Sequence, residues 1–232
     1  MKRIVEPELL DELPPGDPLA VGSRRDLCRV NAWMRHHAIM AGALQGRWNG
    51  HAPRQIIELG AGDGNFLLQV AQKISSRWPN AIATLLDRRK TVTQQTLVSF
   101  ASFGWHAEAI TADVFDWLPA ANAAEVVMAN LFLHHFDEAD LAGLLRAIAD
   151  RARLFVALEP RRAPLPLLCS RLLWAIGCNR VTRHDAVVSV RAGFSSNELS
   201  TLWPDKPNWQ LTEQAAGLFS HLFIAQKIGR AT

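Results

Sequence analysis

Short apolar runs alternate with amphipathic stretches along the middle of the chain. A run of four to eight apolar residues bounded by turn residues indicates a buried strand, and apolar positions three and four apart indicate a helix. Strands are expected at 54–59, 81–86, 106–111, 125–130 and 154–158, and helices at 65–77, 92–103 and 137–149. Strands that alternate with helices are typical of an α/β fold with a parallel sheet.

The first fifty residues have a different pattern. Residues 1–22 are rich in proline and acidic residues, which predicts an extended arm. Ser23 is the expected N-cap of a helix that runs to Leu44, with Asp26 three residues on as a short capping box. The stripe of this helix includes His37, either as a core histidine or, with Arg35 and His36, as a residue that faces a ligand.

The last third of the chain is less regular. Residues 163–207 contain an apolar helix at 165–176 that Gly177 ends, a polar segment at 180–185, and a short helix at 196–202. The apolar helix is expected to pack on the core, to form a lid or to mediate dimer contact. Two further strands, 209–215 and 220–227, are joined through Gly217 as a hairpin.

Composition limits the class of protein. A chain of 232 residues with 49% hydrophobic and 20% charged residues is long enough for one α/β domain with additions. The net charge of +3 carries no basic cluster, so nucleic acid is not an expected partner. The chain lacks an N-terminal apolar region and a stretch long enough to span a bilayer, so a cytoplasmic protein without a membrane span is expected. Three scattered cysteines indicate neither a disulfide framework nor a zinc site, and no metal is expected.

The stretch 56–65 carries the main chemical motif. An apolar run ends at Glu58 and is followed by Gly60, Gly62 and Gly64. Such a turn needs positive φ angles and close approach of the backbone to a ligand. The dinucleotide fingerprint would place its third glycine at position 65, where this chain has Asn65. A carboxylate before the turn suits a cationic ligand rather than a pyrophosphate.

This stretch resembles motif I, E/D-x-G-x-G-x-G, of the class I S-adenosylmethionine (SAM) dependent methyltransferases. The resemblance covers about residues 54–227. It implies a three-layer α/β sandwich with a seven-stranded, mostly parallel sheet in the order 3-2-1-4-5-7-6 and an antiparallel last strand. It also implies an arm and cap helix at 1–50, a methyltransferase core at 51–232 with a substrate lid at 163–207, SAM as methyl donor and S-adenosylhomocysteine (SAH) as product.

The same resemblance implies a set of cofactor-binding residues. The glycine turn would run under the methionine part of SAM, Asp87 would hold the ribose, and Asp113 would meet the adenine amino group beside the backbone N–H of Val114. Asp113 also has a plain alternative as an N-cap or turn residue. The expected cofactor-binding residues are Glu58, Gly60, Ala61, Gly62, Asp87, Arg88, Asp113, Val114 and Asn130.

The segment after the fourth strand, Leu131 to Phe136, resembles that of the ubiquinone/menaquinone methyltransferase-like group. It lacks the prolines that family members acting on exocyclic amines carry there. The chain has no tyrosine, so histidine is the expected base for a hydroxyl acceptor. His135 or His134 is the first candidate catalytic residue and His184, beside Asp185, is the second; a purely structural histidine at a helix start is the alternative.

These features predict a SAM-dependent methyltransferase that acts on a small, apolar aromatic or polyketide-like acceptor, more readily at oxygen than at carbon. The alternatives are a C-methyltransferase acting on a quinone precursor and a SAM-binding partner protein without catalysis, with an RNA methyltransferase ranked last. A homodimer through the apolar lid or the N-terminal helix is a further expectation.

Overall fold

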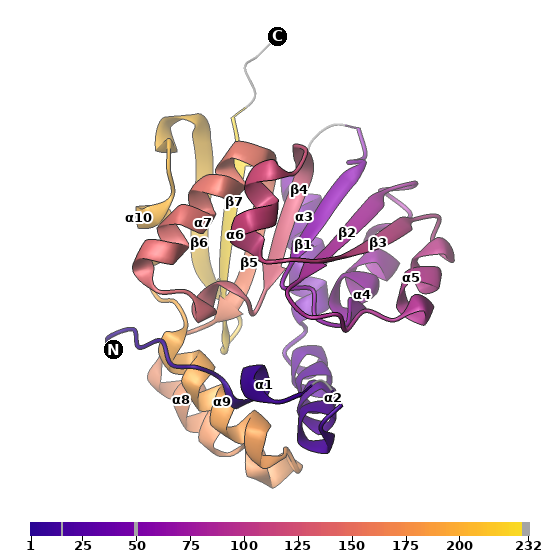
Figure 1. Ribbon diagram of the computed structural model, residues 1–232. Helices are drawn as coiled ribbons and strands as arrows, with labels where there is room; N and C mark the ends of the chain where they lie inside the picture. Colours follow the sequence, from indigo (N-terminus) through magenta and orange to yellow (C-terminus); the bar gives the residue numbers. More distant parts are fainter. Residues whose placement is uncertain (15, 49–50, 229–232) are drawn as a thin grey trace.

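The computed structural model of the protein describes residues 1–14, 16–48 and 51–228 (Figure 1). Seven strands form one sheet in the order β3-β2-β1-β4-β5-β7-β6. The strands are β1 (Gln55–Leu59), β2 (Ile82–Asp87), β3 (His106–Thr111), β4 (Ala124–Asn130), β5 (Ala152–Pro160), β6 (Trp209–Ala216) and β7 (Ser220–Lys227). Strands β1 to β5 pair in parallel, and β7 lies antiparallel between β5 and β6, so the predicted fold class is confirmed.

Side-chain alternation along the strands builds the two faces of the core. Ile56 belongs to one buried cluster and the next residue, Ile57, to the other. Continuous apolar runs are therefore buried on both faces, which a parallel sheet in a three-layer fold requires. The α-helices are α1 (Leu9–Glu12), α2 (Pro18–Trp33), α3 (His36–Arg47), α4 (Asn65–Ile74), α5 (Gln94–Ala101), α6 (Val114–Trp117), α7 (Glu138–Arg151), α8 (Pro164–Arg171), α9 (Arg180–Ala192) and α10 (Glu198–Leu202).

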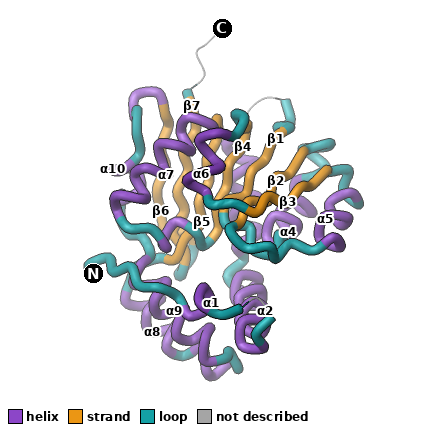
Figure 2. The backbone as a smooth tube through the Cα atoms, viewed as in Figure 1, coloured by secondary structure: helices purple, strands orange, loops and turns teal. Residues whose placement is uncertain are grey.

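Helices cover both faces of the sheet. Residues of α3, α4 and α5 share one buried cluster with one face, and residues of α6, α7 and α10 share the second cluster with the other face. Figure 1 shows α6, α7 and α10 in front of the sheet and α3, α4 and α5 behind it. The remaining helices, α1, α2, α8 and α9, form a separate group below one end of the sheet (Figure 2).

The N-terminal prediction is wrong in its helix boundaries. The helix α2 begins at Pro18, because the Asp17 carboxylate accepts a hydrogen bond from the Leu19 N–H at 2.7 Å and proline is favoured at the first helical position. Ser23 lies inside this helix, buried, and its hydroxyl accepts a bond from the Thr182 hydroxyl. Arg35 has a φ of 59°, so the predicted single helix is broken into α2 and α3.

The region 163–207 is more helical than predicted. The segment at 180–185 is the first part of α9, whose N-cap Asn179 accepts a bond from the Thr182 N–H at 2.9 Å. The apolar helix ends at Arg171 and continues as a 3-10 turn, Leu173–Ile176, which Gly177 stops with a φ of 77°. The hairpin of β6 and β7 through Gly217 is confirmed. Every described helix is too short or too polar to cross a bilayer.

Candidate active site

A cavity of about 660 Å³ lies between the sheet and the lower helical group. Its floor comes from the loops after β1, β2, β3 and β4, and its cover comes from residues 5–12, α2 and the start of α3. Ligands of open α/β sheets bind outside the carboxyl ends of the strands, where this cavity lies. All nine predicted cofactor-binding residues line it: Glu58, Gly60, Ala61, Gly62, Asp87, Arg88, Asp113, Val114 and Asn130.

The glycine turn after β1 forms part of the cavity floor. Gly60, Gly62 and Gly64 have φ angles of 69°, 56° and 75°. A Cβ on Gly60 would lie 2.3 Å from the Phe132 ring, so this position has neither the backbone conformation nor the space for a side chain. The turn thus leaves bare backbone facing the cavity.

Glu58, on β1, is a buried carboxylate at the cavity. It is 2% exposed, and its Oε2 has no hydrogen-bond partner among the described residues. Burial raises the pKa of Glu58 well above its ordinary value, and the nearby carboxylates of Asp63 and Asp87 raise it further. A cationic ligand group would stabilise the charged form and satisfy the unpaired oxygen. The residues therefore fit the ammonium end of SAM.

Asp87, at the end of β2, links the glycine turn after β1 to the turn after β2. Its Oδ2 accepts a hydrogen bond from the Gly62 N–H and its Oδ1 accepts one from the Arg89 N–H, both at 2.8 Å. Each carboxylate oxygen keeps a second lone pair that can accept a bond from a ligand hydroxyl. Asp87 thus shapes the glycine turn directly, a contact that the motif alone does not reveal.

Asp113 is the N-cap of the short helix α6, where its Oδ1 accepts a bond from the Phe115 N–H at 2.8 Å. The alternative role of Asp113, as a helix N-cap, is therefore present in the structure. Asp113 also lines the cavity, so capping and ligand contact are compatible. Val114 is 7% exposed and packs into the core below.

The adjacent histidines His134 and His135 have different environments. His134 is buried between two carboxylates, with Nδ1 at 2.8 Å from Glu159 and Nε2 at 3.3 Å from Glu8. Burial lowers its pKa, but the bonds to Glu159 and Glu8 outweigh burial and raise the pKa to about 9. A protonated imidazole cannot accept a proton, which disfavours His134 as a catalytic base; its catalytic role stays a prediction.

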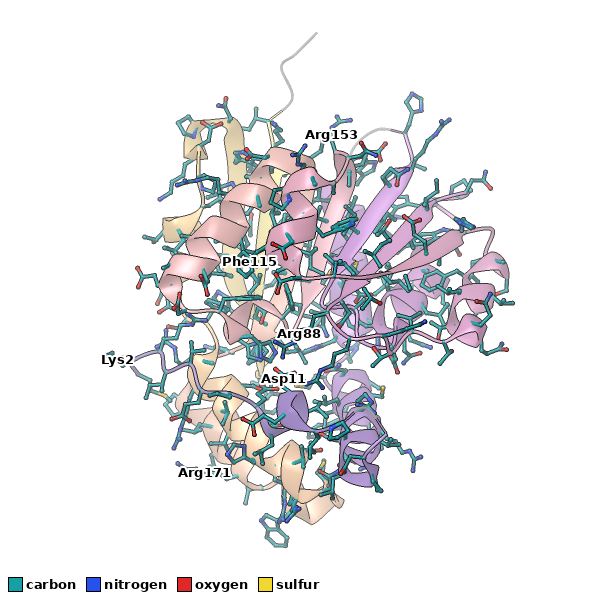
Figure 3. All side chains as sticks on the ribbon, in the orientation of Figure 1. Lys2, Asp11, Arg88, Phe115, Arg153 and Arg171 are labelled. Atoms are coloured by element: carbon teal, nitrogen blue, oxygen red, sulfur yellow. The ribbon has the colours of Figure 1, made fainter. Side chains whose placement is uncertain are left out.

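His135 is the predicted catalytic histidine that faces the cavity. Burial and the positive charge of His134 lower the pKa of His135, so its ring is neutral at pH 7. Its Nδ1 lies 3.6 Å from Asp11, and that carboxylate lies 3.1 Å from the Arg88 guanidinium. Figure 3 shows Asp11 and Arg88 beside each other between the sheet and the lower helices.

His184 lies away from the cavity. Its side chain is 49% exposed on α9, and its Nδ1 lies 3.0 Å from the carboxylate of Asp185. Asp185 also accepts bonds from the backbone N–H groups of Leu9 and Leu10, both at 2.9 Å, so its role is to hold α1. The position of His184 outside the cavity lining does not support a catalytic role, and His184 as a second catalytic candidate stays a prediction.

The cavity cover also differs from expectation. Within the described chain, no residue of 163–207 lines the cavity, so the apolar helix is not a lid in direct contact with it. The cover is the N-terminal segment, and it is held by long-range bonds: Arg3 donates to the carbonyls of Ala192 and Phe136, and Arg89 donates to that of Leu10. The helix α9 supports this segment from outside.

Sequence reasoning missed Glu8, Asp11 and Glu159. Glu8 and Asp11 lie in a segment expected to be an extended arm, more than 120 residues from the histidines that they contact, and no local pattern indicates such a contact. Glu8, His134 and His135 bring potential metal-ligand atoms within 4.8 Å of one another. The protonated His134 has no free lone pair for a metal, and the absence of a metal stays a prediction.

The chain is similar in sequence and in fold to known methyltransferases. Residues 56–153 match the family model of the methyltransferase domain. A search of curated proteins finds no match. Among solved structures, the plantazolicin methyltransferase BpumL in complex with SAH superposes with a TM-score of 0.66 at 13% identity over 92% of each chain.

Two further structures share the fold. A putative O-methyltransferase from Nostoc punctiforme has a TM-score of 0.62 at 16% identity, over 97% of this chain and 64% of that one. The magnesium protoporphyrin IX methyltransferase from Synechocystis, with bound SAH, has a TM-score of 0.59 at 13% identity, over 88% of this chain and 86% of that one. Residues 56–153 are thus similar to the methyltransferase domain, and the described chain shares the fold of these methyltransferase structures.

Proposed function

We propose that the protein transfers a methyl group from SAM to an oxygen of a small, largely apolar aromatic or polyketide-like acceptor. The observation that carries this proposal is a neutral histidine, His135, on the wall of the cavity that gathers the expected SAM-binding residues. Apolar side chains line the same cavity: Leu27, Phe66, Phe132 and Phe136. Such walls suit a flat, apolar acceptor.

The chemistry needs little beyond positioning and a base. Bound SAM supplies an electrophilic methyl group on a sulfonium that leaves as a neutral thioether. Alignment of the acceptor in a dry site supplies roughly 7–11 kcal/mol of the barrier reduction. As the acceptor oxygen bonds to the methyl carbon, its proton passes to the His135 ring. Asp11 lies beside Nδ1, which leaves Nε2 as the nitrogen that accepts the proton.

The cofactor would be held by the residues on the floor of the cavity. Glu58 accepts from the ammonium group, the glycine turn passes under the methionine chain, and Asp87 accepts from the ribose hydroxyls. Arg88 lies next to Asp87 on the same rim. Asp113 and Val114 meet the adenine ring. The cavity positions and the unpaired oxygen of Glu58 support this assignment.

The proposal is tested by SAH release with a panel of phenols, hydroxyquinones and hydroxylated aromatic acids. With a weakly acidic phenol, His135→Asn is expected to lower kcat/KM about 10²–10⁴-fold, because the base is lost. In the wild type, kcat/KM should fall with decreasing pH through a pKa below 6.5, since the folded-state pKa of His135 is lowered and its protonation removes the base.

His184→Asn is the matched control, because it changes a histidine outside the cavity and should leave kcat/KM unchanged. Carbon-13 NMR of the product formed with methyl-labelled SAM identifies the acceptor atom. A C-methyl product, or full activity of His135→Asn, would contradict the proposal. Binding of SAM without SAH release from any acceptor would favour a binding protein instead.

A further inference from the structure

A buried histidine links three elements behind the cavity. His36, the first residue of α3, is 1% exposed. Its Nδ1 lies 3.0 Å from Oδ1 of Asn130, the last residue of β4, and its Nε2 lies 2.7 Å from the hydroxyl of Ser220, the first residue of β7. Asn130 lines the cavity but His36 does not, so His36 can act on a ligand only through Asn130.

The hydrogen bonds of His36 determine which atom of the Asn130 amide faces the histidine and which one faces the cavity. The amide oxygen faces Nδ1, so Nδ1 carries the proton and donates it, and Nε2 accepts from the Ser220 hydroxyl. Burial lowers the pKa of His36 to about 4, which keeps the ring in the neutral state that this pattern requires. The Asn130 amide nitrogen has no partner among the described residues and is not a buried unpaired atom, so its N–H groups reach the cavity.

Asn130 lies on the same face of the sheet as Glu58. Strands β1 and β4 are neighbours, and Glu58 pairs in register with Met128, two residues before Asn130. Side chains two residues apart on a strand point to the same face. The cavity thus has a buried acceptor for a cation on β1 and a hydrogen-bond donor on β4. An amino-acid zwitterion, such as the methionine end of SAM, is complementary to this pair.

We propose that His36 is a positioning residue that turns the N–H groups of Asn130 toward the α-carboxylate of bound SAM. The inference rests on SAM as the ligand of this cavity and does not depend on the acceptor or on the His135 base. The cavity also contains Arg24, Arg88 and Arg89, and recognition of the carboxylate by one of these cations is the competing arrangement.

The test compares the affinities for SAM and for decarboxylated SAM, which lacks only the α-carboxylate. Loss of a hydrogen bond to a charged group weakens binding about tenfold or more. The wild type is therefore expected to bind SAM at least tenfold more tightly than decarboxylated SAM. His36→Gln places its amide near the position of Nε2 and loses the bond to Asn130, so the preference should fall to about threefold or less. His36→Asn places its amide near the position of Nδ1 and should retain the preference.

Two further variants separate positioning from packing. Ser220→Ala removes the partner of Nε2 but leaves the Asn130 bond, so the SAM preference should remain. Asn130→Ala should lose it as His36→Gln does. Because the preference is a ratio measured on the same protein, a loss of stability in a variant does not change it. Nitrogen-15 NMR of the wild type should show the His36 proton on Nδ1.

Three results would overturn the inference: a proton on Nε2, an equal preference in wild type and His36→Gln, or a preference in Ser220→Ala that falls as far as in His36→Gln. If SAM binds but the preference for SAM over decarboxylated SAM is unchanged in both His36→Gln and Asn130→Ala, an arginine of the cavity binds the carboxylate instead. If the wild type binds SAM but releases no SAH with any acceptor, the proposed function fails while this inference stands.

Discussion

The buried histidines of this protein differ in charge because their contacts differ. His134 is protonated between Glu8 and Glu159, whereas burial without a carboxylate partner leaves His36 neutral. His135 stays neutral partly because its neighbour is charged. At pH 7 the fold thus places a protonated ring, His134, next to a neutral ring, His135, that faces the cavity. The adjacent positions of these histidines in the sequence do not indicate which ring is protonated.

The dual position of Asp113 gives a prediction about the adenine end of the site. Asn caps a helix as well as Asp does, so Asp113→Asn should keep the bond to the Phe115 N–H and change the free energy of unfolding by less than about 0.5 kcal/mol. If Asp113 also accepts from the adenine amino group, SAM affinity should fall by about threefold to tenfold. Urea unfolding measures the stability and SAM titration measures the affinity. An unchanged affinity for SAM would show that Asp113 caps α6 without contacting the adenine.

His36 gives a prediction about acid stability. Its folded-state pKa is about 4 and its unfolded-state pKa is about 6.5, so protonation favours the unfolded chain. The stability it contributes is complete above about pH 6.5 and is lost as the pH falls toward 4, by roughly 3 kcal/mol in all. Urea unfolding between pH 7 and pH 4 should therefore show a steeper loss of stability for the wild type than for His36→Asn. Parallel slopes would contradict this assignment.

At the scale of elements, the sequence predicted the sheet better than the cap. The strands and their order follow from the apolar runs, the glycine turn and the family resemblance. The predicted cofactor-binding residues line the cavity because they lie at the ends of strands. The prolines of residues 1–22 indicate an extended arm, but Pro18 occupies the first position of α2, where proline favours a helix, so the pattern does not reveal where α2 begins. The N-terminal segment covers the cavity through contacts with α9 and the segment after β4, and such long-range pairing leaves no periodic pattern.

The N-terminal segment gives a prediction about local stability. Glu8 bonds to His134 and Ser189, and its pKa is lowered to about 2, mainly by His134, which outweighs burial. Glu8→Gln should lower the free energy of unfolding at pH 7 by about 1.5–3 kcal/mol, since a bond to a charged group is lost. Hydrogen exchange should speed up at Leu9 and Leu10, whose N–H groups bond to Asp185.

The exposed Glu6 offers a control for this prediction, because Glu6→Gln removes the same charge from the same segment. Its exchange rates should match those of the wild type, and β5 should remain protected in both variants. Unchanged exchange at α1 in Glu8→Gln would show that the segment is held without the Glu8–His134 pair.

At the scale of the molecule, the loops at one end of the sheet provide the floor of the cavity, and residues 5–12 with α2 and the start of α3 provide its cover. The apolar helix at 164–171 faces away from the cavity, and its exposed apolar residues, with those of the following turn, are Leu165, Leu168, Leu172, Trp174 and Ile176. A homodimer through this face stays a prediction. The cavity that contains the predicted site residues therefore lies between the sheet and the lower helical group.

The most direct test of the central claim is a calorimetric titration of the protein with SAM. One SAM should bind per chain, and Gly60→Ala should weaken binding at least tenfold, because its Cβ would lie 2.3 Å from the Phe132 ring at a φ of 69°. Gly42→Ala, a helix position with nothing within 4 Å, should bind as the wild type does. No heat with the wild type, or equal affinity in Gly60→Ala, would contradict the assignment of this cavity to SAM.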